Sequence, residues 1–208
     1  AGAMPVKVAP GLRGSVELPP HLRLGMNCRA YERFCREELP KVGWTFGPSG
    51  RWTPDTVKAW RSKYPEGLSW IAEQYKNRLT GYDVAEATKM WLRENKAEDK
   101  SVCEVLKERG WEGVGEAELF LSHVQAESPF DTWYAMSTID HRFGAARRGT
   151  KHEGSIVWVD YFCLRQLRND FKPEQIAELI RKTGAVYVRI DGAETVSYTH
   201  LTLPTNGC

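Results

Sequence analysis

The residues best suited to chemistry follow two short apolar runs, AELFLS and SIVWVDYF, in the second half of the chain. The candidate binding residues are Ser122, His123, Gln125 and Glu127 after the first run, and Asp160, Cys163 and Gln166 at and after the second. Carboxylates, amides and an imidazole can hydrogen-bond a sugar or a base. The start of a helix at 128–131 would offer free backbone N–H groups to a phosphate or carboxylate. Together these groups could hold a dinucleotide without a glycine-rich fingerprint.

Each candidate also has a purely structural interpretation. Ser122 and His123 can end a strand and bond the neighbouring loop, and Asp160 can accept hydrogen bonds from loop N–H groups. Cys163 lies in an apolar run with no His close to it in sequence, which is typical of a small buried hydrophobe rather than a nucleophile. The polar residues that follow form either a solvated loop or a partner surface: Arg165, Gln166 and Arg168.

Three apolar runs, of which the third is AVYVRID, alternate with helical patterns. A short apolar run that leads into a helix is typical of a buried parallel strand and its crossover connection. Ser128 predicts the start of the first helix, Pro173 the start of the second, and Gly184 its end. Ligands bind beyond the carboxyl ends of parallel strands, so the candidates should share one edge of the sheet with Asp191 and Glu194.

These runs carry a resemblance to a known group of domains. The segment LFLSHVQAES resembles the first-strand motif of Toll/interleukin-1 receptor (TIR) domains and of the related fungal heterokaryon-incompatibility (HET) domains, where an apolar strand ends in Ser followed by an aromatic residue or His. The segment VWVDYFCLRQLRNDFKPEQIAELIRKTGAVYVRIDG resembles the second HET block: an apolar strand, Asp, Cys and Gln, then a helix and another apolar strand. The resemblance implies an α/β fold with a flavodoxin-like or TIR-like parallel sheet, incomplete after its third strand and preceded by an α-helical segment.

The same resemblance implies two alternative functions. One is an intracellular signalling domain that acts by self-association or by binding a protein partner. The other is hydrolysis of NAD or a related nucleotide, because some TIR domains resemble glycosidases in using a carboxylate to stabilise an oxocarbenium-like state. In those enzymes the carboxylate is a Glu in a Trp-x-x-x-Glu pattern, which this chain lacks. NAD is therefore the one cofactor suggested, its catalytic Glu is expected beyond the end of the chain, and the chain itself is expected to be inactive.

The first half of the chain has helical rather than strand-like patterns. Residues 27–113 are expected to be a helical accessory segment, either a subdomain or a cover for one face of the sheet. Thr53 and Pro54 predict one helix start, and Asp99 predicts another. Gly110 predicts the end of that second helix.

The remaining boundaries follow from composition. Residues 1–26 contain several Pro and Gly and are expected to form a flexible leader. Residues 114–195 are expected to form the partial α/β domain. The string VSYTHLTLPT matches the translation of a sequencing-library adapter, so residues 196–208 are expected to be a non-native tail.

Composition excludes several classes of protein. A formal net charge of +2, with 41% hydrophobic and 27% charged residues, is ordinary for a globular protein. The basic loop RFGAARRGTKHEG contains no recognisable binding motif, so a nucleic-acid partner is not expected. The five cysteines show neither a CxxC pair nor metal-ligand spacing with the five histidines, which favours reduced thiols in the cytoplasm and no metal. No apolar run approaches the roughly 20 residues of a membrane span, so no membrane partner is expected.

Overall fold

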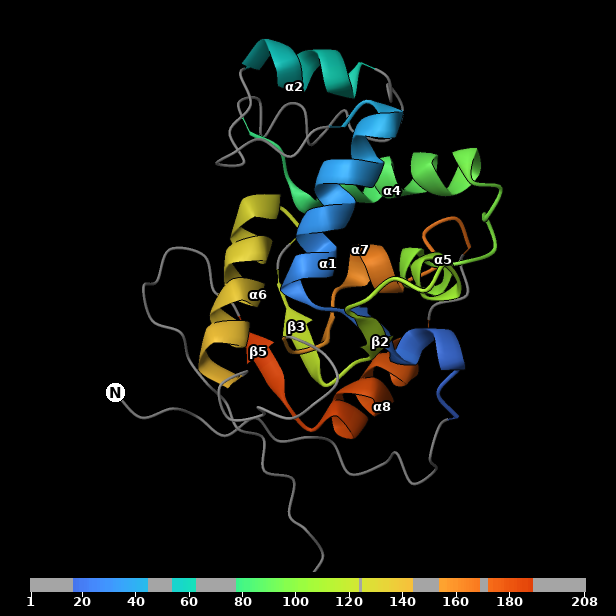
Figure 1. Cartoon of the computed structure of the whole chain (residues 1–208), viewed down its shortest axis with the longest axis vertical. Helices are drawn as coiled ribbons and strands as arrows, with labels where there is room; N and C mark the ends of the chain where they lie inside the picture. The colour runs from blue at the N-terminus through green and yellow to red at the C-terminus, as the bar shows by residue number, and fades with distance from the viewer. Residues whose placement is uncertain are drawn as a thin grey trace, which may run out of the picture.

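A computed structural model gives the arrangement of the chain in space (Figure 1). It describes residues 17–44, 54–62, 78–123, 125–143, 154–168 and 172–188. In this part of the chain, helices surround one five-stranded sheet, so the fold is of the mixed α/β class. The predictions for residues 1–16, for most of the basic loop and for the adapter-like tail lie outside the described residues.

Strand order confirms the predicted relation of the three apolar runs. The strands are β1 (Leu24–Met26), β2 (Val114–Glu116), β3 (Leu119–Ser122), β4 (Val157–Trp158) and β5 (Val186–Val188), in the order β2-β1-β4-β3-β5. Strand β3 runs parallel to both of its neighbours, with Phe120 opposite Trp158 of β4 on one side and Val186 of β5 on the other. By contrast, β1 runs antiparallel to β2 and to β4. The sheet is therefore mixed, with a parallel part formed by the predicted strands.

Part of the expected leader belongs to this sheet. Residues 17–26 enter the fold through a 3₁₀ turn, η1 (Pro20–Arg23), which leads directly into β1. Leu18, Leu22 and Met26 are buried in the main core. The expectation of a flexible leader is wrong for these residues, because they form β1, which pairs with β2 and β4. Gly25 allows close packing here, since its backbone lies against the Val157 carbonyl.

The helices begin and end largely where capping residues predicted. Their bounds are α1 (Cys28–Arg33), continued by a π-helical turn η2 (Phe34–Glu38) and a 3₁₀ turn η3 (Leu39–Val42), then α2 (Pro54–Arg61), α4 (Gly81–Glu94), α5 (Val102–Glu108), α6 (Pro129–Phe143), α7 (Asp160–Cys163) and α8 (Pro173–Thr183). Ser128 caps α6 by accepting a hydrogen bond from the Phe130 N–H at 3.2 Å. Gly184 ends α8 with a φ of 66°. These starts and ends confirm the predictions for α6 and α8 and the start of α2 at Pro54, whereas its predicted cap, Thr53, lies outside the described residues.

The start of α5 differs from the prediction. Its N-cap is Ser101 and not Asp99. The Ser101 Oγ accepts a hydrogen bond from the Glu104 N–H at 3.2 Å, and the Glu104 carboxylate accepts one from the Ser101 N–H at 2.7 Å. This capping box satisfies two donors at once, which a single Asp cap could not do.

The second apolar run is also shorter as a strand than predicted. Only Val157 and Trp158 pair within the sheet, and Asp160 begins the short helix α7 instead of ending the strand. The Val159 carbonyl accepts hydrogen bonds from the N–H groups of Phe162 and Cys163 at 3.1 and 3.0 Å. An apolar run buried on all sides does not distinguish a strand from a buried helical turn, which explains the error.

The helical first half covers the sheet and shares its core. Buried side chains from α1, α4 and α5 join those of the strands in one continuous cluster. Phe34 stands edge-on to Trp91 of α4 and to Phe162 of α7, with ring centroids 5.0 and 5.2 Å apart. Helices α1 and α6 lie side by side (Figure 1). Of the two alternatives for the helical segment, these contacts favour a cover.

We predict that Gly25→Ala destabilises the protein, because the new Cβ would lie 2.5 Å from the Val157 carbonyl oxygen in the adjacent strand. The two nearest atoms belong to the Val157 backbone and can move little, so the free energy of unfolding should fall by about 1–3 kcal/mol. Urea denaturation measures the effect. The matched control is Gly115→Ala, opposite Gly25 in register, where the nearest atom to the new Cβ lies 4.0 Å away. Equal losses in the two variants would contradict the packing argument.

Candidate functional site

His123, directly after β3, lies at the centre of the candidate residues. Its side chain is only 2% exposed. Its Nε2 is 3.1 Å from Oδ1 of Asp160, at the start of α7, and its Nδ1 is 3.2 Å from Oε1 of Glu127. The Nδ1 contact brings the two charges together but lacks the alignment of a hydrogen bond. The imidazole therefore bridges two carboxylates.

These contacts determine the charge of the ring. Burial alone would disfavour the charged imidazole, but Asp160 and Glu127 outweigh it and raise the pKa of His123 to about 9. Burial also opposes ionisation of Asp160, and the hydrogen bond from His123 is the main contact that holds the pKa of this carboxyl below its ordinary value. At neutral pH the pair is an imidazolium and a carboxylate. A protonated ring has no lone pair, so His123 cannot act as a general base there.

Two further side chains complete the group. The Gln125 Nε2 donates to Oδ2 of Asp160, and the Thr132 Oγ1 of α6 donates to Oε1 of Glu127 at 2.7 Å. The Tyr161 N–H donates to Oδ1 of Asp160 at 2.6 Å. We refer to His123, Gln125, Glu127, Thr132 and Asp160 as the polar cluster. Its donors and acceptors are largely used by one another.

Aromatic residues close one side of the polar cluster. The ring of Tyr161 stands edge-on to His123, with centroids 5.4 Å apart. The hydroxyl groups of Tyr161 and Tyr31 are 3.1 Å apart, and the Tyr31 hydroxyl donates to the Pro129 carbonyl at 2.9 Å. Burial raises the pKa of both phenols well above the ordinary value. Both therefore remain neutral at neutral pH, and Tyr161 covers this side of the His123 ring.

The loop that carries the polar cluster is also held by the helical half of the chain. The Gly81 and Tyr82 N–H groups, at the start of α4, donate to the carbonyls of Glu127 and Gln125 at 3.0 and 3.2 Å. A Cβ at Gly81 would lie 2.9 Å from the Gln125 carbonyl oxygen, so this approach needs glycine. The first N–H groups of α4 are thus used to fix the loop.

The structure brings together four of the seven predicted residues: His123, Gln125, Glu127 and Asp160. Gln166 lies beside them, because its Nε2 donates to the Asp160 carbonyl at 3.0 Å. The polar ends of β3 and β4 thus meet at one edge of the sheet, as predicted.

The other predicted residues lie elsewhere. Ser122 ends β3 in register with Val188 and is not part of the polar cluster. Cys163 contacts Cys103 of α5, with 3.7 Å between the sulfur atoms. Arg165 pairs with Glu104 at 2.7 Å, so it is part of a structural contact. Asp191 and Glu194 lie outside the described residues.

Sequence reasoning missed three residues around His123. Tyr161 directly follows Asp160, and Thr132 lies in the first turn of the helix predicted after Ser128, so position alone could have suggested both. Tyr31 gave no signal, because it is 130 residues from Tyr161 in the chain. Contacts of this separation depend on the fold.

Comparisons with known proteins add no relative: no family model, curated protein or solved structure matches the chain. Within the described residues, no group of three or more His, Cys, Asp or Glu side chains could hold a metal ion. None of the described helices has the length and apolar character to cross a membrane. Fold and site together define a mixed α/β protein with a buried imidazolium between two carboxylates at the carboxyl ends of parallel strands.

We predict that the polar cluster stabilises the fold in a pH-dependent way. The pKa of His123 is about 9 in the folded state, above the unfolded value of roughly 6.5, so its contribution is full below about pH 6.5 and is lost as pH rises through about 9. The loss has an upper bound of roughly 3 kcal/mol. Asp160, whose pKa is lowered, contributes above the ordinary carboxyl range and loses its contribution as pH falls.

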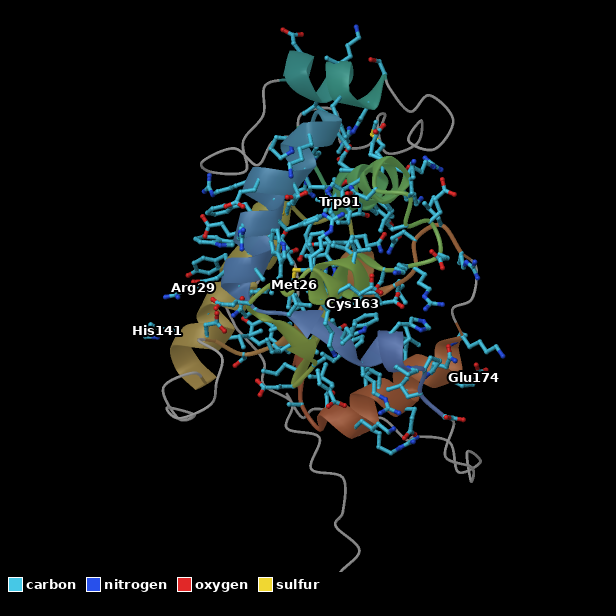
Figure 2. All side chains as sticks on the ribbon, turned by 45° about the vertical axis from the view of Figure 1, so that its right-hand side comes forward. Met26, Arg29, Trp91, His141, Cys163 and Glu174 are labelled. Carbon is cyan, nitrogen blue, oxygen red and sulfur yellow. The ribbon has the colours of Figure 1, made fainter. Side chains whose placement is uncertain are left out.

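Urea unfolding of the wild type and of His123→Gln at several pH values measures this contribution. The fall in stability between about pH 6.5 and 9.5 should shrink in the variant. His141→Gln is the matched control, because His141 is exposed at the end of α6, at the periphery of the molecule in Figure 2. An unchanged pH profile in His123→Gln would refute the assignment.

Proposed function

We propose that this chain is an intracellular, cytoplasmic signalling domain of the TIR/HET-like kind, with a sheet of the flavodoxin-like or TIR-like type, that acts by self-association or by binding a protein partner. Support comes from the two resembling segments, which lie on neighbouring parallel strands with their polar residues at the same edge. The observation that carries the choice of binding over catalysis is the state of His123. It is buried, protonated and contacted at both nitrogens.

Strand β5 supplies a surface for self-association. It ends the order of the described strands. The Phe120 N–H donates to the Ala185 carbonyl at 3.1 Å, and Phe120 lies in register with Val186. In a parallel ladder, alternate residues face the neighbouring strand, so the N–H groups of Val186 and Val188 point away from β3. Such an edge can pair with a strand of a second copy.

We predict that the full chain associates in a concentration-dependent way and that Val188→Pro weakens this association. Proline removes an outward N–H group and leaves the ladder to β3 intact. With one bond lost from each copy in a symmetric contact, the dissociation constant should rise about tenfold. Sedimentation velocity over a range of concentrations measures it.

Val188→Thr is the matched control, since threonine keeps both the shape of valine and the N–H group. It should associate like the wild type. A monomer at every concentration, or equal behaviour of the two variants, would count against pairing through β5.

Hydrolysis of NAD is the alternative function, and the exposure of Asp160 favours it. The side chain of Asp160 is 24% exposed, whereas that of Glu127 is 2% exposed. Its lowered pKa keeps it ionised at neutral pH, so it could face the positive charge of an oxocarbenium-like state. The chain has no Trp-x-x-x-Glu pattern, so a catalytic Glu of that kind would have to come from outside it.

Because no Trp-x-x-x-Glu pattern is present, we predict that the full chain releases no nicotinamide from NAD above the buffer blank, even at high protein concentration. Chromatography of the reaction mixture measures nicotinamide directly. Asp160→Asn is the informative variant. Release by the wild type that disappears in Asp160→Asn would favour the hydrolase and overturn the choice of binding over catalysis.

A further inference from the structure

Two buried cysteines from distant parts of the chain meet in the core. Cys103 lies in α5 and Cys163 at the end of α7, 60 residues apart in sequence, and their sulfur atoms are 3.7 Å apart. Both are free thiols and fully buried. Figure 2 shows Cys163 in the interior, whereas Glu174 and His141 lie at the periphery. This pair is separate from the polar cluster and independent of which function holds.

The elements that carry the two sulfur atoms are held together by other contacts. Arg165, two residues after Cys163, forms two hydrogen bonds of 2.7 and 3.0 Å with Glu104, the residue after Cys103. The Cys163 sulfur also accepts a hydrogen bond from the Val159 N–H at 3.3 Å. The sulfur atoms are therefore kept in contact by the surrounding structure and not by chance rotation of free side chains.

The two sulfur atoms need only a short movement to form a disulfide bond. Bonded sulfur atoms lie about 2.0 Å apart, so the pair at 3.7 Å needs an approach of less than about 2 Å. Rotation of the two side chains and small shifts of α5 and α7 can supply this.

We propose that Cys103 and Cys163 are a disulfide-forming pair, which a peroxide oxidises so that α5 becomes covalently joined to α7. The thiolate of one cysteine, formed when the thiol loses its proton, attacks a peroxide oxygen. The O–O bond breaks to give a sulfenic acid and hydroxide, and the hydroxide takes up a proton to form water. The second thiolate then attacks the sulfenic sulfur, and hydroxide leaves and takes up a proton to form a second water. In sum, two thiols lose two electrons and two protons, and one hydrogen peroxide becomes two waters.

Burial sets the rate of this reaction. Loss of solvent contact raises the pKa of the Cys103 thiol well above its ordinary value, so little thiolate is present in the closed structure. Peroxide must therefore enter when α5 and the end of α7 separate locally. The Glu104–Arg165 ion pair, with side chains 16% and 24% exposed, lies on the outside of this junction and opposes that opening.

The test uses the folded full chain in a Cys208→Ser background, which removes the C-terminal thiol. The protein is treated with hydrogen peroxide, the remaining thiols are blocked, and peptides are mapped by mass spectrometry without reduction. The expected product is a cross-linked pair of peptides containing Cys103 and Cys163, lighter by two hydrogen atoms. The closed loop should raise the unfolding midpoint by roughly 5–10 °C, and reduction should reverse the shift.

Two cysteine variants and one reference cysteine within the protein control the experiment. Cys35→Ala removes an equally buried thiol and should leave the cross-link unchanged, while Cys103→Ala should abolish it. Cys28, which is slightly exposed, reports how far oxidation has gone. If Cys28 is oxidised while Cys103 and Cys163 stay reduced, or become separate sulfinic acids, the proposal is overturned. This comparison of oxidation states needs only the Cys208→Ser protein and neither of the further variants.

Glu104→Gln tests the role of the ion pair. Glutamine keeps the capping box with Ser101 but loses the charge that pairs with Arg165. Cross-linking should become several-fold faster, with the same product. An unchanged rate would overturn the role of the ion pair in access, and a different product would overturn the assignment of the pair.

Discussion

A buried positive charge between two negative ones is the constraint on which the surrounding structure depends. A protonated imidazole out of contact with water is costly unless carboxylates compensate it, and Glu127 does so from the loop after β3 and Asp160 from the start of α7. Loss of the imidazolium would leave the two carboxylates without a compensating positive charge. The loop after β3 and the start of α7 are therefore fixed relative to each other by electrostatics as well as by the strand ladder.

This constraint explains why a helical half is packed over the sheet. The segment that carries Gln125 and Glu127 needs partners for its backbone carbonyls, and Tyr31 of α1 and the first N–H groups of α4 supply them. The start of α4 is itself anchored by a buried ion pair between Arg61 of α2 and Asp83, with Nη2 and Oδ2 2.8 Å apart. The Thr80 N–H also donates to Asp83 at 2.7 Å. A continuous set of contacts thus connects α2 with the loop around His123.

Sequence reasoning recovered the parts of this arrangement that depend on local physics. Apolar runs, Pro at helix starts and Gly184 after α8 depend on neighbours in the chain, and they predicted the three parallel strands and most helix ends. It failed where partners are distant. Leu24 and Met26 form a strand because β2 and β4 lie beside them, which no local pattern reveals. Likewise, His123 was predicted as a ligand-binding residue, but its charge and burial depend on Asp160 from another element.

The Asp, Cys and Gln of the second resembling segment each have a structural role in this fold. Asp160 pairs with His123, Cys163 contacts Cys103, and Gln166 donates to the Asp160 carbonyl. Together they fix α7 against the loop after β3 on one side and against α5 on the other. Any chain that builds this junction in the same way needs similar residues at these positions, whatever it binds. A likeness in this motif therefore reports first on packing, and the two proposed functions depend instead on the edge of β5 and on the exposed part of Asp160.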